Sequence, residues 1–384
     1  MPIQAIYFSR FKPTYERGGG SRRMLQIYEL FKKIIPDLRL VTNMGGDPEE
    51  KRLKKKIRKE SNRKDFFAPP RRAISLRKWH ENHLTMAYRL REFSKIWTRS
   101  ITSVTGLKAL DMVIMDDPIY FLPLFKKLLR RRIPVVASSQ NLETLAPNQV
   151  KKKWALDFFK EELEVLSRCR LVITVSREED VLLNNLGIPS LFIPYYPGEP
   201  ILQRLLTVRH NREKTVKDGF LTIGNAKNLQ TREGMKNLGL YWQENHLEAA
   251  AGKLLLGGLN SDEFLTPDQF GDSVEFLGTL PHDRLDHILT QVKAFICYQE
   301  SGSGSLTRIC DMLCAGVPVL ANTYAARTYY NMKGVMEFRN LDELGKILKQ
   351  FDTFTGDIPL PPEPSTAFLE AEIGKIIQDA GIFK

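Results

Sequence analysis

The stretch that decides the fold runs from Glu300 to Asn322 and reads ESGSGSLTRICDMLCAGVPVLAN. It follows AFICY, a short apolar run typical of a buried parallel strand, and it ends in VPVLAN, which begins another such run. Between these runs apolar residues recur at helical spacing, and Gly316 and Pro318 end the helix. The stretch therefore predicts a strand, a glycine-rich turn, a helix and a second strand, the order of an α/β protein.

The glycine-rich turn suits a phosphate. Backbone N–H groups at a helix start have no partner within the helix, and flanking glycines let an anion approach them closely. Arg308 and Asp311 lie three residues apart, hence on one face of the helix, where they suit a phosphate and a hydroxyl-bearing sugar. The alternative is an ordinary α/β turn with a solvated ion pair, and this segment alone does not separate the two.

Size and composition indicate a globular protein of two domains. The chain has 384 residues, more than one ordinary core accommodates. Hydrophobic residues make up 42% of it, which excludes a chain disordered throughout. No stretch has the pattern of a signal peptide or of a membrane span, so we expect a cytoplasmic protein. Four cysteines lack metal-ligand spacing, and we interpret them as buried free thiols in a reducing compartment. They are Cys169, Cys297, Cys310 and Cys314.

Strand-like and helix-like segments alternate along the chain, which predicts parallel sheets covered by helices on both faces. The first series runs from IQAIYFS at residues 3–9 to SLFIPYYP at residues 190–197. Residues 198–219 look like a connector, and the alternation restarts at Phe220. We expect a first domain over residues 1–200 and a second over residues 215–360. A last helix at about 366–384 is expected to pack back on the first domain.

The excess of basic residues is concentrated in two stretches. Lys and Arg number 57 and Asp and Glu 45, a formal charge of +12. Residues 51–64 carry nine basic side chains and one acid, and residues 126–132 read KKLLRRR. Such stretches attract anionic surfaces or are simply solvated. Because no nucleic-acid-binding motif accompanies them, we rank membrane lipid above nucleic acid, and expect residues 51–64 to contact the inner membrane face.

A resemblance to a known family rests on five stretches: GSGSLTRICDMLCAGVPVLAN, VEFLGTLPHDRLDHILTQVKAFICYQ, SSQNLETL, RLVITVSREEDVLLNNLGIPSLFIPYYP and GGGSRR. Together they resemble retaining glycosyltransferases of the GT-B fold, glycosyltransferase group 1 or family 4. The resemblance implies an α/β protein with two doubly wound, Rossmann-like parallel-sheet domains that face a cleft. It also implies a nucleoside diphosphate sugar as the donor, bound by the second domain, an acceptor on the first domain, and neither a metal ion nor a cofactor.

The same resemblance implies roles for individual residues. Arg308, Glu300 and Gln140 are expected to be catalytic, with Arg308 meeting the charge of the leaving diphosphate in place of a metal ion. Asp311 is expected to bind the ribose. The full set of implied donor-binding residues is Gly18, Gly19, Gly20, Gly224, Arg232, Gly302, Ser303, Gly304, Ser305, Leu306, Arg308 and Asp311.

Three positions bear on whether the chain is active. Relatives carry two glutamates eight residues apart, where this chain has Ser303 and Asp311, and a histidine where it has Gln140. A histidine can exchange a proton, whereas an amide can only hydrogen-bond. The expected function is transfer of a sugar, with retention, to a glycan or lipid-linked acceptor. The alternative is a GT-B-fold binding or scaffold protein with reduced catalysis.

Overall fold

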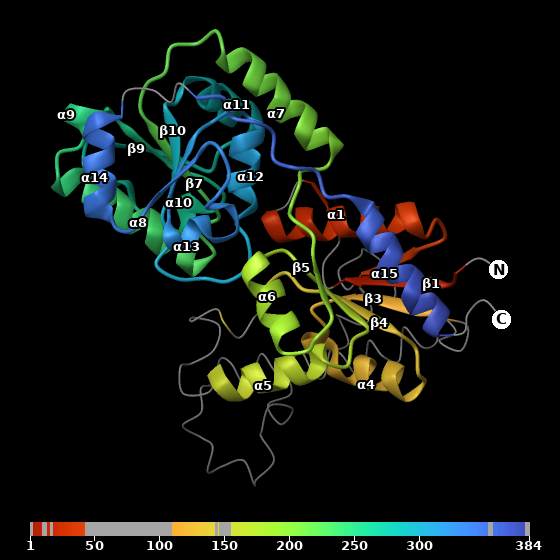
Figure 1. Cartoon of the computed structure of the whole chain (residues 1–384). Helices are drawn as coiled ribbons and strands as arrows, with labels where there is room; N and C mark the ends of the chain where they lie inside the picture. The colour runs from red at the N-terminus through yellow and green to blue at the C-terminus, as the bar shows by residue number, and fades with distance from the viewer. Residues whose placement is uncertain are drawn as a thin grey trace, which may run out of the picture.

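The computed structural model describes residues 3–9, 14–15, 18–42, 110–142, 145, 155–351 and 356–380. Two six-stranded parallel sheets form the centres of two α/β domains (Figure 1). The alternation of strands and helices predicted from the sequence is confirmed in both. The basic stretch at residues 51–64 lies outside the described residues.

The first sheet has the strand order β2-β1-β3-β4-β5-β6, and all neighbouring strands are parallel. Its four central strands are buried at every residue because helices cover both faces. The strands are β1 (Ala5–Ser9), β2 (Arg39–Thr42), β3 (Met112–Asp116), β4 (Val135–Ser138), β5 (Leu171–Thr174) and β6 (Ser190–Phe192). The helices of this part of the chain are α1 (Gly19–Ile34), η4 (Pro118–Phe121), α4 (Leu122–Arg130), α5 (Ala155–Leu166) and α6 (Arg177–Asn185).

The second sheet has the order β12-β11-β10-β7-β8-β9, again with parallel neighbours. Its strands are β7 (Phe220–Ile223), β8 (Leu254–Gly257), β9 (Val274–Gly278), β10 (Ala294–Cys297), β11 (Val319–Asn322) and β12 (Val335–Phe338). The longer helices around it are α8 (Leu229–Glu244), α11 (His282–Gln291), α12 (Thr307–Cys314) and α14 (Leu341–Gln350). Short helical turns are α9 (Glu248–Ala251), α10 (Ser261–Phe264), η7 (Pro267–Gln269), α13 (Thr323–Ala326) and η8 (Arg327–Tyr329).

The predicted connector is largely helical. It contains α7 (Glu199–Arg212), which packs against α11 and α12 of the second domain. A proline at the start of the helix has its φ angle already set for a helix. Ile201, Leu205 and Val208 are buried at helical spacing, so the apolar pattern is present in the sequence, between a proline-rich stretch and a charged run.

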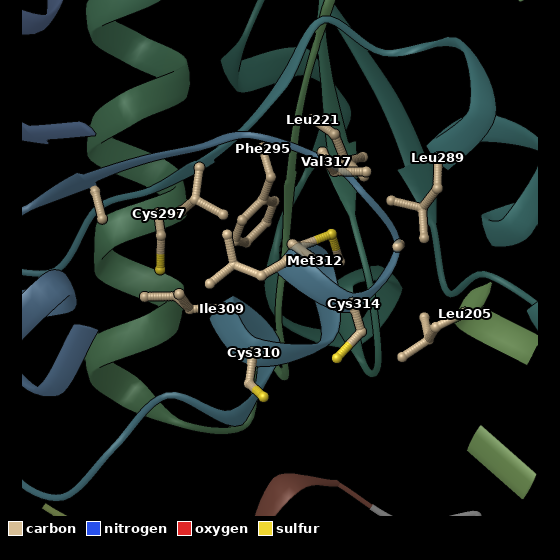
Figure 2. Packing of buried hydrophobic residues seen from close by; sticks show 14 of the residues in the cluster. Leu205, Leu221, Leu289, Phe295, Cys297, Ile309, Cys310, Met312, Cys314 and Val317 are labelled. Carbon is tan, nitrogen blue, oxygen red and sulfur yellow. The ribbon is translucent and has the colours of Figure 1, made fainter. Parts of the chain in front are cut away.

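The helix α12 is anchored by its apolar face. Ile309 and Met312 of this helix belong to one buried cluster with Phe295 of β10 and Leu221 of β7 (Figure 2). The packing joins α12 to the two strands at the centre of the second sheet. It therefore holds the start of α12 at a defined place beyond the carboxyl ends of these strands.

The helix α15 (Thr366–Asp379) lies with the first domain, although it follows the second in the sequence (Figure 1). Its buried side chains join the apolar cluster that contains Ile27 and Phe31 of α1. The residues that α15 supplies to this cluster are Leu369, Ile373, Ile376 and Ile377. The chain thus passes twice between the two domains.

The cysteines are buried and none of the four is in a disulfide, as the sequence predicts. Among the helices that the structure describes, none combines the length and the hydropathy needed to cross a lipid bilayer. The stretch at residues 126–132 falls mostly in α4, whose apolar side chains Leu124, Phe125 and Leu128 are buried in the first domain.

Candidate functional site

The centre of the second sheet is a topological switch point. Strands β7 and β10 are neighbours, and the chain proceeds from them to opposite edges of the sheet. In open α/β sheets ligands bind beyond the carboxyl ends of the strands at such a point. Gly224 follows β7 directly, and residues 302–305 form the turn between β10 and α12. Two of the predicted donor-binding segments therefore meet at this place.

Arg308 lies at the switch point, in the first turn of α12. Its Nη1 lies 3.4 Å from Thr231 Oγ1, a long contact, and its Nε lies 3.4 Å from Cys297 Sγ, a hydrogen bond of ordinary length to a weak acceptor. A Cβ atom at Gly224 would lie 3.4 Å from Arg308 Nη1 and 2.2 Å from Thr231 Cγ2, so glycine permits this close packing. Among the described residues Arg308 has no carboxylate partner. Its charge is therefore free to meet an anion.

The turn before α12 depends on its glycines. Gly302 and Gly304 have φ angles of 134° and 69°, in the region that L side chains rarely adopt. A Cβ at Gly304 would lie 2.8 Å from the carbonyl oxygen of Gln140 in the first domain. Asn141 Nδ2 also donates to Ser303 Oγ at 3.1 Å. The turn therefore lies directly against the loop that follows β4, at the interface of the two domains.

Arg327 holds this turn from the other side. Its guanidinium donates to the carbonyl oxygen of Ser303 at 2.7 Å and to that of Gly304 at 2.5 Å. Burial lowers the pKa of Arg327, and nearby Glu179 opposes that shift. These carbonyls accept from the arginine, which fixes the turn, and the backbone N–H of Gly304 donates to Glu179 Oε1 at 3.0 Å. Ser305 is fixed as well, because its hydroxyl donates to Tyr329 Oη at 2.8 Å.

The start of α1 in the first domain faces the start of α12. A Cβ at Gly19 would lie 2.3 Å from Thr307 Oγ1, whereas one at Gly20 would meet nothing within 4 Å. Gly18 is the N-cap of α1 and Leu306 that of α12, and neither cap nor first turn supplies an acidic side chain. Two positive helix ends thus converge at one place, which favours binding of an anion.

Asp311 joins the two domains. It is buried in α12, and it accepts from Arg22 Nη1 of α1 at 2.8 Å and from the Tyr195 hydroxyl at 3.2 Å. Burial raises the pKa of Asp311, while Arg22 and Tyr195 act in the opposite direction. Both carboxylate oxygens therefore have a protein partner. Ribose binding by Asp311 stays a prediction, and it requires that Asp311 share its oxygens with a ligand.

Comparison with solved structures identifies the fold. No protein-family model matches the sequence, and no curated protein matches it. Sucrose-phosphate synthase from Thermosynechococcus elongatus has a similar structure, with a TM-score of 0.58 and 14% identity over 98% of this chain and 94% of that one. HepE from Anabaena, in a complex with UDP-glucose, has a TM-score of 0.56 and 12% identity over 99% of this chain and 98% of that one. TarM has a TM-score of 0.56 and 10% identity, covering 98% and 94%. The fold is GT-B.

Within the GT-B fold, the other predicted catalytic residues lie at different depths. Glu300 follows β10 and is exposed, and its Oε1 accepts from Asn237 Nδ2 at 2.8 Å and from the Tyr298 hydroxyl at 3.2 Å. Gln140 lies in the first-domain loop after β4, where its backbone N–H donates to Asp117 Oδ1 at 3.1 Å. The Nε2 atom of Gln140 is buried and has no hydrogen-bond partner in the described part of the chain. The described residues therefore give this amide nitrogen no partner, and a catalytic role for Gln140 stays a prediction.

Arg232, predicted to bind the donor, lies in the first turn of α8. Its guanidinium carbon lies 5.2 Å from the centre of the Phe264 ring, and its Nε lies 3.5 Å from Glu233 Oε1. The stacking on Phe264 and the partner Glu233 account for its position. A role in donor binding stays a prediction.

Several residues of the GT-B domain interface escaped the sequence analysis. Arg22 was part of a quoted motif, but its pairing with Asp311 joins positions far apart in the chain. Arg327 belongs to none of the stretches that carry the resemblance, whereas Glu179 and Tyr195 lie in RLVITVSREEDVLLNNLGIPSLFIPYYP without a role assigned to either. Charged residues next to helix starts are common in any sequence, so no local signal singles these out. In the described part of the chain, no group of three or more His, Cys, Asp and Glu side chains could hold a metal ion.

Proposed function

We propose that the protein is a retaining glycosyltransferase that takes a sugar from a nucleoside diphosphate sugar. One observation carries the proposal: the positive ends of α1 and α12 and the unpaired Arg308 meet at the switch point of the second sheet. This arrangement suits a diphosphate between the two domains. The donor-site pattern between Gly302 and Asp311 supports retention of configuration by its resemblance to the retaining family.

The proposed chemistry is stabilisation of a leaving diphosphate. Negative charge develops on the diphosphate as its bond to the sugar breaks, and fixed donors that meet this charge supply the largest catalytic contribution in many enzymes. Here the donors are the Arg308 guanidinium, the backbone N–H groups of Gly302, Ser303 and Ser305, and those at Gly18–Gly20; the N–H of Gly304 already donates to Glu179. Glu300 is assigned to the sugar and Gln140 to the sugar or the acceptor, each through hydrogen bonds.

A panel of donors tests the proposal. HepE was solved with UDP-glucose, so uridine nucleotides are the first to try. Thermal shift with UDP, GDP and ADP sugars should identify the nucleotide, because a ligand that binds only the native state raises the melting temperature. Turnover of the stabilising donor with glycan and lipid-linked acceptors should then follow. If no nucleotide sugar binds at millimolar concentration, the assignment is wrong.

A binding protein with reduced catalysis is the second candidate. Ser303, at the position where relatives carry the first glutamate, already accepts from Asn141 across the domain interface. Because the Ser303 hydroxyl is used in this bond between the domains, its position is explained more directly by domain contact than by catalysis. Tight binding of a nucleotide sugar with neither transfer nor hydrolysis, for every acceptor tried, would favour this candidate.

The role of Asp311 makes a separate prediction. If Asp311 accepts a hydrogen bond from the ribose, Asp311→Asn should weaken UDP binding about tenfold or more, since hydrogen bonds to charged groups are worth ~1.5–3 kcal/mol. It should also remove most of the preference for UDP over 2′-deoxy-UDP, measured by calorimetry. The control is Arg22→Gln, which breaks the same ion pair and should leave that preference intact. An unchanged preference in Asp311→Asn would assign the residue to joining the domains alone.

The acceptor is proposed to be membrane-linked, through residues 51–64. Basic side chains near an anionic leaflet contribute about 1 kcal/mol each, less at high salt. We expect the protein to float with liposomes rich in anionic lipid at low salt, and to be released at high salt. A variant with five changes to Ser should stay unbound; the changed residues are Lys54, Lys55, Lys56, Arg58 and Lys59. Equal flotation of the two proteins would remove this stretch from the proposal and favour a glycan acceptor free in solution.

A further inference from the structure

Glu179 is a buried acid at the interface of the two domains. It lies in the first turn of α6, where its backbone N–H donates to the N-cap Ser176 at 3.4 Å. At this position a glutamate side chain commonly reaches back to its own helix start. Here Glu179 Oε1 instead accepts from the backbone N–H of Leu142 at 3.1 Å and from that of Gly304 at 3.0 Å. Stabilisation of its own helix therefore does not account for its orientation.

These two N–H groups belong to the two loops that face each other across the interface. Leu142 belongs to the first-domain loop after β4 that contains Gln140, and Gly304 is in the turn that precedes α12. A single carboxyl oxygen thus joins the proposed acceptor side to the proposed donor side. The second oxygen, Oε2, is buried and has no partner among the described residues. Only one of the two carboxyl oxygens of Glu179 therefore accepts hydrogen bonds from the described part of the chain.

The charges around Glu179 come from three elements. Arg327 of η8 favours the carboxylate, Glu162 of α5 disfavours it, and the N–H groups of Leu142 and Gly304 favour it. Burial is the largest influence, and together these raise the pKa of Glu179 from its ordinary 4.5 to about 7. Glu178, the neighbour on the same helix, is exposed and accepts from the Thr328 hydroxyl at 3.0 Å.

We propose that Glu179 is a positioning residue of the transfer reaction: its Oε1 orients the loop at 140–142 and the turn at 302–305 toward each other. Oε1 accepts both N–H bonds in either protonation state, whereas a negative charge buried between the domains opposes their contact. When the domains separate, the carboxyl group meets water. The expected effect of Glu179 on catalysis rests on the proposed function. Its expected effect on domain separation rests only on the contacts at the interface.

The pH dependence follows from the direction of the pKa shift. A carboxyl group whose pKa is raised in the closed arrangement binds protons more tightly there than in the open one. Closing is thus favoured below the ordinary pKa, and this advantage is lost as the pH rises toward 7. If the open state has the ordinary value of 4.5, the closing equilibrium should fall about tenfold between about pH 6 and pH 8.5.

The experiment compares the full-length wild-type protein with Glu179→Gln, Glu179→Ala and Glu178→Gln. Small-angle scattering without ligand at both pH values reports domain separation. Wild type and Glu178→Gln should expand at the higher pH. Glu179→Gln, which is neutral and keeps an acceptor oxygen, should stay compact at both. Glu179→Ala, which leaves the Gly304 N–H without its acceptor, should be expanded at both.

Kinetics with the donor found by thermal shift provide the second readout. The donor KM of wild type should rise over this pH range, about threefold if the closing equilibrium passes through unity and at most about tenfold, that of Glu179→Gln should stay flat, and Glu179→Ala should have the raised KM throughout. Identical pH behaviour of wild type and Glu179→Gln in scattering would overturn the inference, as would a compact Glu179→Ala. Scattering changes as expected without any turnover would instead retain Glu179 as the residue that joins the domains and reject the proposed function.

Discussion

Arg308→Ala should lower kcat/KM about 10- to 150-fold and should abolish the thermal shift caused by the donor. The range follows from a charge-assisted hydrogen bond to phosphate, worth ~1.5–3 kcal/mol. The protein should stay folded, because the contacts of Arg308 with Thr231 Oγ1 and Cys297 Sγ, each at 3.4 Å, contribute little to the free energy of unfolding. Steady-state kinetics and circular dichroism measure the two effects separately.

Two further variants sharpen this prediction. Arg308→Lys keeps the charge but loses the planar guanidinium fork, so it should recover part of the binding and less of kcat. Arg339→Ala removes an exposed arginine whose partner is Glu343 on α14, and should behave as wild type. Normal kinetics in Arg308→Ala would mean that the diphosphate binds elsewhere. A large loss of melting temperature would assign Arg308 to the structure of the second domain.

Gly19→Ala should reduce kcat/KM about 100-fold. The added Cβ would lie 2.3 Å from Thr307 Oγ1 and 3.3 Å from Thr307 Cβ, so rotation of the threonine side chain relieves the contact only in part. The starts of α1 and α12 would have to move apart, and displacement of a reacting group by about 1 Å costs on the order of 10²-fold. Folding of each domain should be preserved, because alanine suits a helix better than glycine.

Gly20→Ala is the matched comparison, one residue further along α1. A Cβ at Gly20 meets nothing within 4 Å, and the backbone N–H is retained. This variant should lose far less activity than Gly19→Ala and should melt at the same or a higher temperature. Similar losses in both variants would show that backbone freedom at the start of α1, rather than its contact with α12, is what the reaction needs.

The sequence predicts the elements well because their signals are local. The apolar runs and the Gly316–Pro318 helix stop indicate the two parallel sheets and the placement of α12 without any knowledge of distant contacts. The helix α7 was assigned to a connector because prolines precede it and a charged run follows it, although Ile201, Leu205 and Val208 recur at helical spacing. Element type thus follows from apolar spacing except where neighbouring turn and charge signals indicate a linker.

Local sequence patterns do not predict which residues the site residues contact. Asp311 was predicted as a ribose ligand from its place on α12, but its contacts with Arg22 and Tyr195 arise only when α1 and the exit of the first domain meet α12. Glu179 has the sequence context of a helix start, and only the fold turns its carboxyl group toward Gly304. Contacts between domains depend on how the domains are placed, which no short pattern encodes.

The return of α15 to the first domain has a consequence for biosynthesis. Roughly 170 residues separate the end of β6 from the start of α15, and at about 5–20 residues per second the ribosome needs roughly 10–30 s to make them. During that interval the apolar face beside Ile27 and Phe31 lacks Leu369 and Ile373. The second domain, made without interruption, is complete earlier. The domain synthesised first is therefore the one that finishes folding last, and it is the one that nascent-chain chaperones have to shield.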